Sequence, residues 1–154
     1  MRAAVYLLLA ALFTLPGCNS NKAAIEPSPI FYSDQVAMIG IEGKIGILGP
    51  EFVANQSNKY MWHFWGTQEE LENGPFRVEA INVKSKQKIK ALVAEAGTSQ
   101  ERLVWEYDSI TGPNNGADAH RPSNLMLPSS GLWRLDSYLG GKSLGSIIVN
   151  VQEE

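Results

Sequence analysis

The segment of residues 133–151 constrains the fold more than any other part of the chain. Polar and apolar residues alternate in WRLDSYL and in SIIVNV, and Gly140-Gly141 lies between the two runs. Alternation with a period of two is typical of a strand that buries one face, and a glycine pair between two such strands predicts a β-hairpin. The side chains expected on its inner face are Trp133, Leu135, Ile147, Val149 and Val151, with Arg134, Asp136 and Asn150 outside.

Short strand patterns recur along the rest of the chain. A short helix is predicted at residues 68–72, because Thr67 and Glu70 have capping-box spacing and Gly74 follows. Residues 89–95 also fit a helix, but their place between strand patterns favours a strand. The fold class expected is all-β, an immunoglobulin-like β-sandwich of seven to nine short antiparallel strands with one short helix. The expected strands are residues 36–41, 44–48, 59–65, 76–83, 89–94, 102–107, 124–127, 133–139 and 146–151.

The segment KYMWHFWG, residues 59–66, concentrates aromatic residues in one predicted strand. Successive side chains of a strand point to opposite faces. One face would carry Tyr60, Trp62 and Phe64, and the other would carry Met61, His63 and Trp65. A sandwich buries one face of each strand. The second face is therefore either covered by the helix and loops, or it is an exposed patch of the kind that marks interaction sites.

The first eighteen residues resemble the export signal of bacterial lipoproteins. The apolar run at residues 3–15 is shorter than the roughly 20 residues that span a bilayer, and it has the length of a signal-peptide core. Leu15-Pro16-Gly17-Cys18 then resembles the lipobox, although Pro16 departs from the usual pattern. The resemblance implies cleavage before Cys18 and a diacylglycerol on its thiol. Cys18 is the only cysteine, so a disulfide within the chain is impossible.

This signal defines the expected organisation of the chain. Residues 1–17 are the predicted signal peptide, residues 18–33 a lipidated tether, and residues 34–154 the β-sandwich domain. The expected location is the cell membrane, with the domain on the extracytoplasmic side. Loss of Arg2 leaves 12 basic side chains against 16 acidic ones, and this mild acidity argues against nucleic-acid binding. The lysine run at 84–90 fits a solvated turn and strand edge.

The two histidines offer the main candidate for metal chemistry. A copper or zinc site would need His63 and His120 to lie together, with Asp118 or Met61 as a further ligand. Their separation of 57 residues favours unrelated roles, and no metal or other cofactor is predicted. The chain has no GxSxG motif and no paired-carboxylate pattern, so no enzymatic activity is expected.

Residues 111–124, TGPNNGADAHRPSN, are expected to form a long loop. Long loops in small domains are usually functional or disordered. The alternative is a self-packed loop in which Asn and Asp side chains satisfy backbone groups. The candidate ligand surface combines this loop with the aromatic strand: Trp62, His63, Trp65, Asp118, His120 and Arg121.

Three motifs together resemble a known family: KYMWHFWG, NNGADAH at residues 114–120, and GLWRLD at residues 131–136. They are similar to an immunoglobulin-like domain of uncharacterised lipoproteins from Bacillus-like bacteria. The resemblance implies fold and location, but no biochemical function. We expect a membrane-anchored, non-enzymatic binding or accessory module that contacts membrane lipid through Cys18 and an envelope protein, peptide or glycan through its domain. The alternatives are a purely structural envelope protein and a metal-binding protein that uses His63 and His120.

Overall fold

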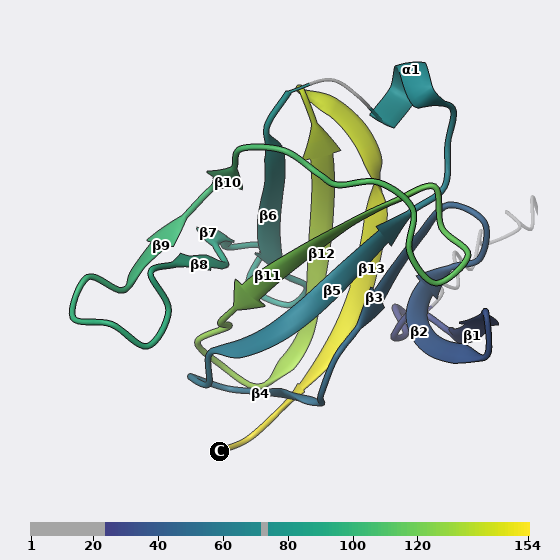
Figure 1. Ribbon diagram of the computed structural model, residues 1–154. Coiled ribbons are helices and arrows are strands. Elements are labelled where there is room, and N and C mark those ends of the chain that lie inside the picture. Colours follow the sequence, from purple (N-terminus) through teal and green to yellow (C-terminus); the bar gives the residue numbers. More distant parts are fainter. Residues whose placement is uncertain (1–23, 72–73) are drawn as a thin grey trace, which may run out of the picture.

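The computed structural model describes residues 24–71 and 74–154, within which thirteen strands form two sheets and there is one short helix, α1 (Gln68–Leu71) (Figure 1). The seven-stranded sheet has the order β1 (Ile30–Ser33), β2 (Val36–Ile41), β3 (Ile45–Leu48), β5 (Asn58–Phe64), β11 (Ala119–Leu125), β8 (Leu92–Ala94) and β9 (Arg102–Val104). The six-stranded sheet has the order β10 (Glu106–Tyr107), β6 (Phe76–Asn82), β12 (Gly131–Leu139), β13 (Lys142–Gln152) and β4 (Phe52–Val53), and β7 (Lys88–Lys90) also pairs with β6.

The predicted all-β class with one short helix is confirmed, but the finer prediction is not. One of the two sheets is curled into a half-barrel, and the strand order does not confirm an immunoglobulin-like topology. The strands also outnumber the seven to nine that were predicted. The pairs among the described strands are antiparallel except for β4 and β13, which are parallel.

Some of the additional strands arise because two predicted strands are divided between the sheets. Residues 89–94 were expected as one strand, but β7 pairs with β6 in one sheet and β8 pairs with β11 in the other. The chain changes sheet at Ala91, which is fully buried. Residues 102–107 divide in the same way at Trp105, between β9 and β10. Strands that switch sheets at a bend form corners of such folds, and a continuous β-pattern does not reveal the bend.

The carboxyl-terminal hairpin has the predicted form. β12 and β13 pair around Gly140 and Gly141, whose φ angles of 53° and 83° lie in the left-handed region that favours glycine. All five side chains predicted for its inner face are at most 2% exposed. They belong to a core between the sheets in which Trp62 and Phe64 of β5 each lie edge-on to Phe76 of β6, with ring centroids 5.4 Å apart.

The second face of β5 is covered as well. Phe31 of β1 lies edge-on to Trp65, with ring centroids 5.7 Å apart. Gly46 of β3 provides the space, because a Cβ atom there would lie 2.8 Å from the Phe31 ring. The indole N–H of Trp65 donates a 2.8 Å hydrogen bond to the carbonyl of Gly116, which fastens residues 114–117 over this face. The second aromatic face is therefore an additional packed layer.

The folded domain begins before the predicted boundary at residue 34. Ile30–Ser33 was placed in the tether, but it forms β1 and pairs with β2. Ser28 is also bound: its backbone N–H donates to the carbonyl of Ile148 at 2.8 Å, and its Oγ accepts from the N–H of Ile148 at 2.9 Å. Pro27 and Pro29 concealed this strand, although proline is compatible with a sheet edge. The predicted signal peptide and Cys18 lie outside the described residues.

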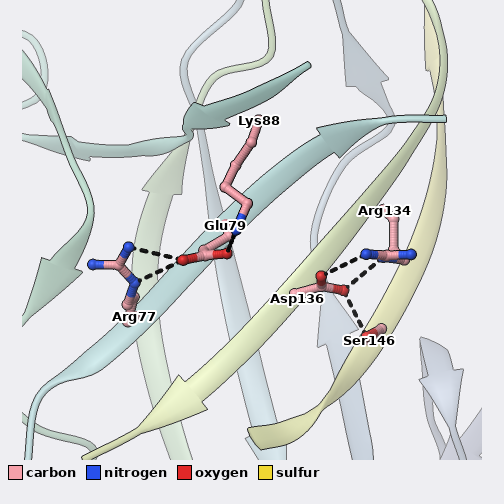
Figure 2. Close-up of polar contacts among 6 residues, drawn as sticks. All are labelled: Arg77, Glu79, Lys88, Arg134, Asp136 and Ser146. Carbon is pink, nitrogen blue, oxygen red and sulfur yellow. Dashed lines mark hydrogen bonds and ion pairs between the residues drawn. The ribbon is translucent and has the colours of Figure 1, made fainter. Parts of the chain in front are cut away.

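The outer face of the six-stranded sheet carries two carboxylates directly opposite one another, Glu79 on β6 and Asp136 on β12. Each residue is 9% exposed. Each carboxylate binds the arginine two residues before it, as Figure 2 shows. The Arg77–Glu79 and Arg134–Asp136 ion pairs both have N–O distances of 2.8 Å. Two like charges facing each other on a sheet are destabilising, and the arginines offset this repulsion.

Each of the two carboxylates has a further donor besides its arginine. Lys88 of β7 forms an ion pair with Glu79, and the Ser146 hydroxyl donates a 2.6 Å hydrogen bond to Asp136. The ammonium of Lys88 and, second, the guanidinium of Arg77 hold the pKa of Glu79 below its ordinary value. The lysine run therefore includes Lys88, a strand residue whose ammonium neutralises the largely buried carboxylate of Glu79.

Candidate functional site

A cleft of about 560 Å³ lies between α1 and the segment of residues 109–113. Apolar side chains of Leu71, Ile110 and Leu139 line it, and polar groups come from Gln68, Ser109, Thr111 and Asp118. Small-molecule sites usually enclose about 300–1,000 Å³ and combine apolar walls with a few polar groups. The cleft has both properties, and a binding site can be built on it.

Helix α1 forms one wall and is held by the predicted capping box. The backbone N–H of Thr67 donates to the Glu70 carboxylate at 2.8 Å, and the N–H of Glu70 lies 3.3 Å from the Thr67 hydroxyl. The Thr67 hydroxyl also donates to the Glu70 carboxylate, at 3.1 Å. The hydrogen bonds that this carboxylate accepts, from the backbone and then from the side chain of Thr67, lower the pKa of Glu70. Leu71 is buried and attaches the helix to the core. Glu72, the predicted last helical residue, lies outside the described residues.

Asp118 joins the two walls of the cleft. Its Oδ2 accepts a 3.0 Å hydrogen bond from the N–H of Gly66, just before α1. Its own N–H donates to the carbonyl of Phe64 at the end of β5. The sequence selected Asp118 as a ligand-surface residue, and the structure places it in the cleft lining.

The opposite wall is a short bridge between Thr111 and His120. Their backbones exchange two hydrogen bonds of 2.8 and 3.0 Å. The Thr111 hydroxyl donates to the His120 carbonyl at 2.9 Å, and the ring Nδ1 of His120 donates to the carbonyl of Gly112 at 2.7 Å. Residues 109–113 are thus attached to the start of β11 while their outer surface lines the cleft.

The predicted loop at 111–124 is only partly a loop. Strand β11 occupies Ala119–Leu125 and pairs with the whole of β5, whereas the expected strand began at residue 124. Pro122 concealed it. A proline lacks a backbone donor, but β8 pairs with β11 only at Asn124 and Leu125, so the edge beside Pro122 is open. Residues 111–118 form the remaining loop, and it is self-packed.

The fold brings the two histidines together. His63 on β5 and His120 on β11 are direct cross-strand partners. Their ring nitrogens nevertheless point to different partners, Asn115 for His63 and Gly112 for His120. Within residues 24–71 and 74–154, no group of three or more His, Cys, Asp and Glu side chains could hold a metal ion.

His63 is part of the layer beneath the loop. It is fully buried, and the Asn115 amide donates a 3.1 Å hydrogen bond to its Nε2. This assignment makes Nε2 the acceptor and places the proton of the neutral ring on Nδ1, which has no hydrogen-bond partner in good geometry. Burial, and second the charge of His120, lower the pKa of His63, against a smaller opposing effect of the Met61 backbone. The neutral ring therefore suits this position.

The other predicted surface residues do not converge on the cleft. Trp62 is fully buried, and its indole N–H donates to the Ser123 hydroxyl at 2.9 Å. Arg121 lies next to His120 in β11 and so points to the opposite face, where its guanidinium lies 5.0 Å from the centre of the Tyr107 ring. Trp62 and His63 are both fully buried, so neither side chain reaches the surface of the described domain.

Comparison with known proteins identifies the family. A family model described as "Domain of unknown function (DUF4871)" matches residues 18–149. The chain belongs to the DUF4871 family. A solved structure, "X-ray Crystal Structure of a Putative Lipoprotein from Bacillus anthracis", is similar in fold, with a TM-score of 0.68, 23% identity, and coverage of 94% of this chain and 98% of that chain. The predicted resemblance to lipoproteins of Bacillus-like bacteria is confirmed. No curated protein matches the chain.

The cleft of this DUF4871 domain was not predicted from the sequence. Its lining comes from segments that are far apart along the chain: Gly66, Gln68, Leu71 and Gly74, residues 109–113, Asp118 and Ala119, and Leu139. The available signals were the capping box and the PNNG turn, which mark the two walls but not their proximity. The paired carboxylates were also missed, although the repeated spacing Arg77-x-Glu79 and Arg134-x-Asp136 is visible in the sequence.

Proposed function

We propose that this DUF4871 protein is a lipid-anchored, extracytoplasmic, non-enzymatic binding protein whose cleft takes a short peptide or glycan fragment of the cell envelope. The cleft itself carries the proposal, because its volume and mixed lining suit a ligand of that size. Thr111 and His120 are joined through two backbone hydrogen bonds, and the His120 ring is bound to the Gly112 carbonyl, which favours a structural role for this pair.

The anchor is supported by the Leu15-Pro16-Gly17-Cys18 motif and by the fold similarity to a protein described as a "Putative Lipoprotein". In the part of the chain that the structure describes, no helix is long and apolar enough to span a bilayer. Two acyl chains on Cys18 would be sufficient for stable attachment. The ligands within reach are then molecules at the outer surface of the membrane.

Filling the cleft tests the proposal. At Gly112 a Cβ atom would meet nothing within 4 Å, so Gly112→Phe is expected to fold and to occupy the cleft. The matched control is Ser99→Phe, at an exposed position between β8 and β9. Isothermal titration with muramyl dipeptide and with N-acetylglucosamine oligomers should give saturable binding of at least one probe, weakened more than tenfold by Gly112→Phe and unchanged by Ser99→Phe. Absence of binding by both probes, or equal binding by both variants, would contradict the proposal.

A further inference from the structure

An apolar surface lies on β1 and β2, at the edge of the seven-stranded sheet. Ile30 and Tyr32 of β1 are 66% and 69% exposed, and Ile41 of β2 is 43% exposed. Ile25, before β1, is 43% exposed. Among the described residues, only Leu103 on β9, at the other edge of the same sheet, is a further large hydrophobic side chain with comparable exposure. Four of the five exposed side chains are thus concentrated near the amino-terminal edge.

The strand register places these side chains on one face. Ile30 is opposite Ile39, and Tyr32 is opposite Ala37, so they share a face on which Ile41 follows two residues later. We call Ile30, Tyr32, Ala37, Ile39 and Ile41 the edge ribbon. On β3 the same face carries buried core residues. The edge ribbon is therefore an extension of the inner face. Ile39 is half-buried against the core, whereas Ile30, Tyr32 and Ile41 remain exposed.

An apolar groove of about 190 Å³ adjoins the edge ribbon. Ile30, Ala37 and Ile39 of the ribbon line it together with Pro50 and with Phe52, the first residue of β4. Exposed apolar surface next to an apolar groove is more favourable against hydrocarbon or headgroup-level lipid than against water. Tyr32 suits such a boundary, because tyrosine combines an apolar ring with a polar tip.

The length of the chain between Cys18 and the domain identifies the surface that lies next to the ribbon. Ser28 is fastened to β13, so only the nine residues 19–27 lie between it and Cys18. The ten residue steps from Cys18 to Ser28 span at most about 35 Å even when fully extended. A domain of this size has a radius of gyration of about 14 Å, so its diameter is comparable to that reach. A lipid on Cys18 would hold the sheet edge formed by β1, which begins two residues after Ser28, close to the bilayer.

The charges around the edge ribbon favour apolar contact over electrostatic adsorption. Glu26, Asp34 and Glu42 lie beside it in the chain, and Lys44 is the nearby cation. This acidic border would not attract anionic lipids. Contact with zwitterionic lipid, insensitive to salt, is the mode that these residues support.

We propose that the edge ribbon, led by Ile30 and Tyr32, lies against the lipid bilayer and orients the anchored domain on it. The proposal rests on the lipid anchor of the proposed function, but not on the cleft ligand. A short tether would then keep one side of the domain turned to the membrane. The edge strand β1 would be protected there from pairing with other chains.

Bromolipid quenching of the full, lipidated chain in phosphatidylcholine vesicles tests the proposal. Tyr32→Trp places a reporter in the ribbon, and Leu103→Trp is the matched control at an exposed apolar position on the opposite sheet edge. After subtraction of the wild-type signal, the Tyr32→Trp emission should be at least twofold lower in brominated than in unbrominated vesicles, and this quenching should persist at high salt. The Leu103→Trp emission should be the same in both kinds of vesicle. Cys18→Ala should move the protein to the soluble fraction.

Each other outcome overturns the proposal. Equal quenching of both reporters, or quenching of neither, would mean that the ribbon has no preferred contact with lipid. A Tyr32→Trp reporter protected from water but not quenched, in a chain that crosslinks as a dimer, would show that a second copy covers β1. Recovery of the wild-type chain in the soluble fraction would refute the anchor itself, and with it both the orientation and the membrane location in the proposed function.

Discussion

The outer faces of the two sheets are stabilised in different ways. The six-stranded sheet exposes its outer face and satisfies it with ion pairs, in which Glu79 and Asp136 are each bound by an arginine (Figure 2). The seven-stranded sheet carries aromatic and imidazole side chains on its outer face and covers them with residues 114–117 and with β1. One face is stabilised by charge in contact with solvent, and the other by a second packed layer.

This difference explains why the alternating pattern of a strand does not by itself predict a binding surface here. From the sequence, the second apolar face of β5 was either covered or an exposed patch, and the loop at 111–124 was either functional or self-packed. The structure shows that residues 114–117 of the loop cover that face. Asn114 and Asn115 reach Met61 and His63. The loop and the aromatic strand therefore bury each other's candidate residues. The cleft, lined by residues 109–113 and by Asp118, remains accessible.

The largest expected effect comes from breaking the cover. Trp65→Ala removes the ring contact with Phe31 and the hydrogen bond to Gly116, and should lower the free energy of unfolding by about 2–4 kcal/mol. Trp105→Ala is the matched control, since Trp105 is also half-buried. Its ring contacts the guanidinium of Arg77, which lies 4.8 Å from the ring centre, and not the loop cover. Its loss should cost about 1 kcal/mol. Urea denaturation of both variants measures the difference, and equal losses would show that the loop cover adds no stability.

The two faces should also respond to acid in different pH ranges. His63 has a lowered pKa in the folded protein, so the unfolded chain binds its proton first, and stability should fall as the pH drops below about 6.5, the ordinary value. Glu79 also has a lowered pKa, so its contribution is present above its ordinary value of 4.5 and is lost as the pH falls through the lower folded value.

Unfolding free energies measured from pH 8 to pH 3 separate the two contributions. His63→Gln should flatten the upper part of the profile and leave the lower part, while Glu79→Gln should do the reverse. Each variant is thereby the control for the other. An upper part that persists unchanged in His63→Gln would show that the covered layer tolerates a charged histidine, contrary to the hydrogen bond from Asn115.

The sequence predicted the parts of the fold that depend on local pattern. The hairpin of β12 and β13, its five inner side chains and the capping box of α1 follow from alternation, a glycine pair and a three-residue spacing. The strands that were missed or shortened, β1 and β11, each contain or adjoin proline, and each tolerates it because the neighbouring edge is open.

The candidate site depended on contacts between distant segments, which a local pattern cannot show. Alternation correctly separated Trp62 from His63 and Trp65, but it could not say that residues 114–117 would cover the second set. The proximity of Leu71, Ile110 and Leu139 in the cleft likewise results from the packing of three elements. Asp118 was selected for its place in a loop, and it lines the cleft because its carboxylate reaches Gly66.

The smallest expected effect is on the ion-pair face. Arg134→Ala removes the partner of Asp136, but the Arg134 side chain is 47% exposed and the Ser146 hydroxyl still donates to the carboxylate. Solvent screening limits such a pair, so the free energy of unfolding should fall by about 0.5–1 kcal/mol. Asn150→Ala, exposed on the same sheet and without an ion pair, is the control and should change it by less. If urea denaturation gave a loss above about 2 kcal/mol for Arg134→Ala, the charged face would be as important to stability as the covered one, and the contrast between the sheets would fail.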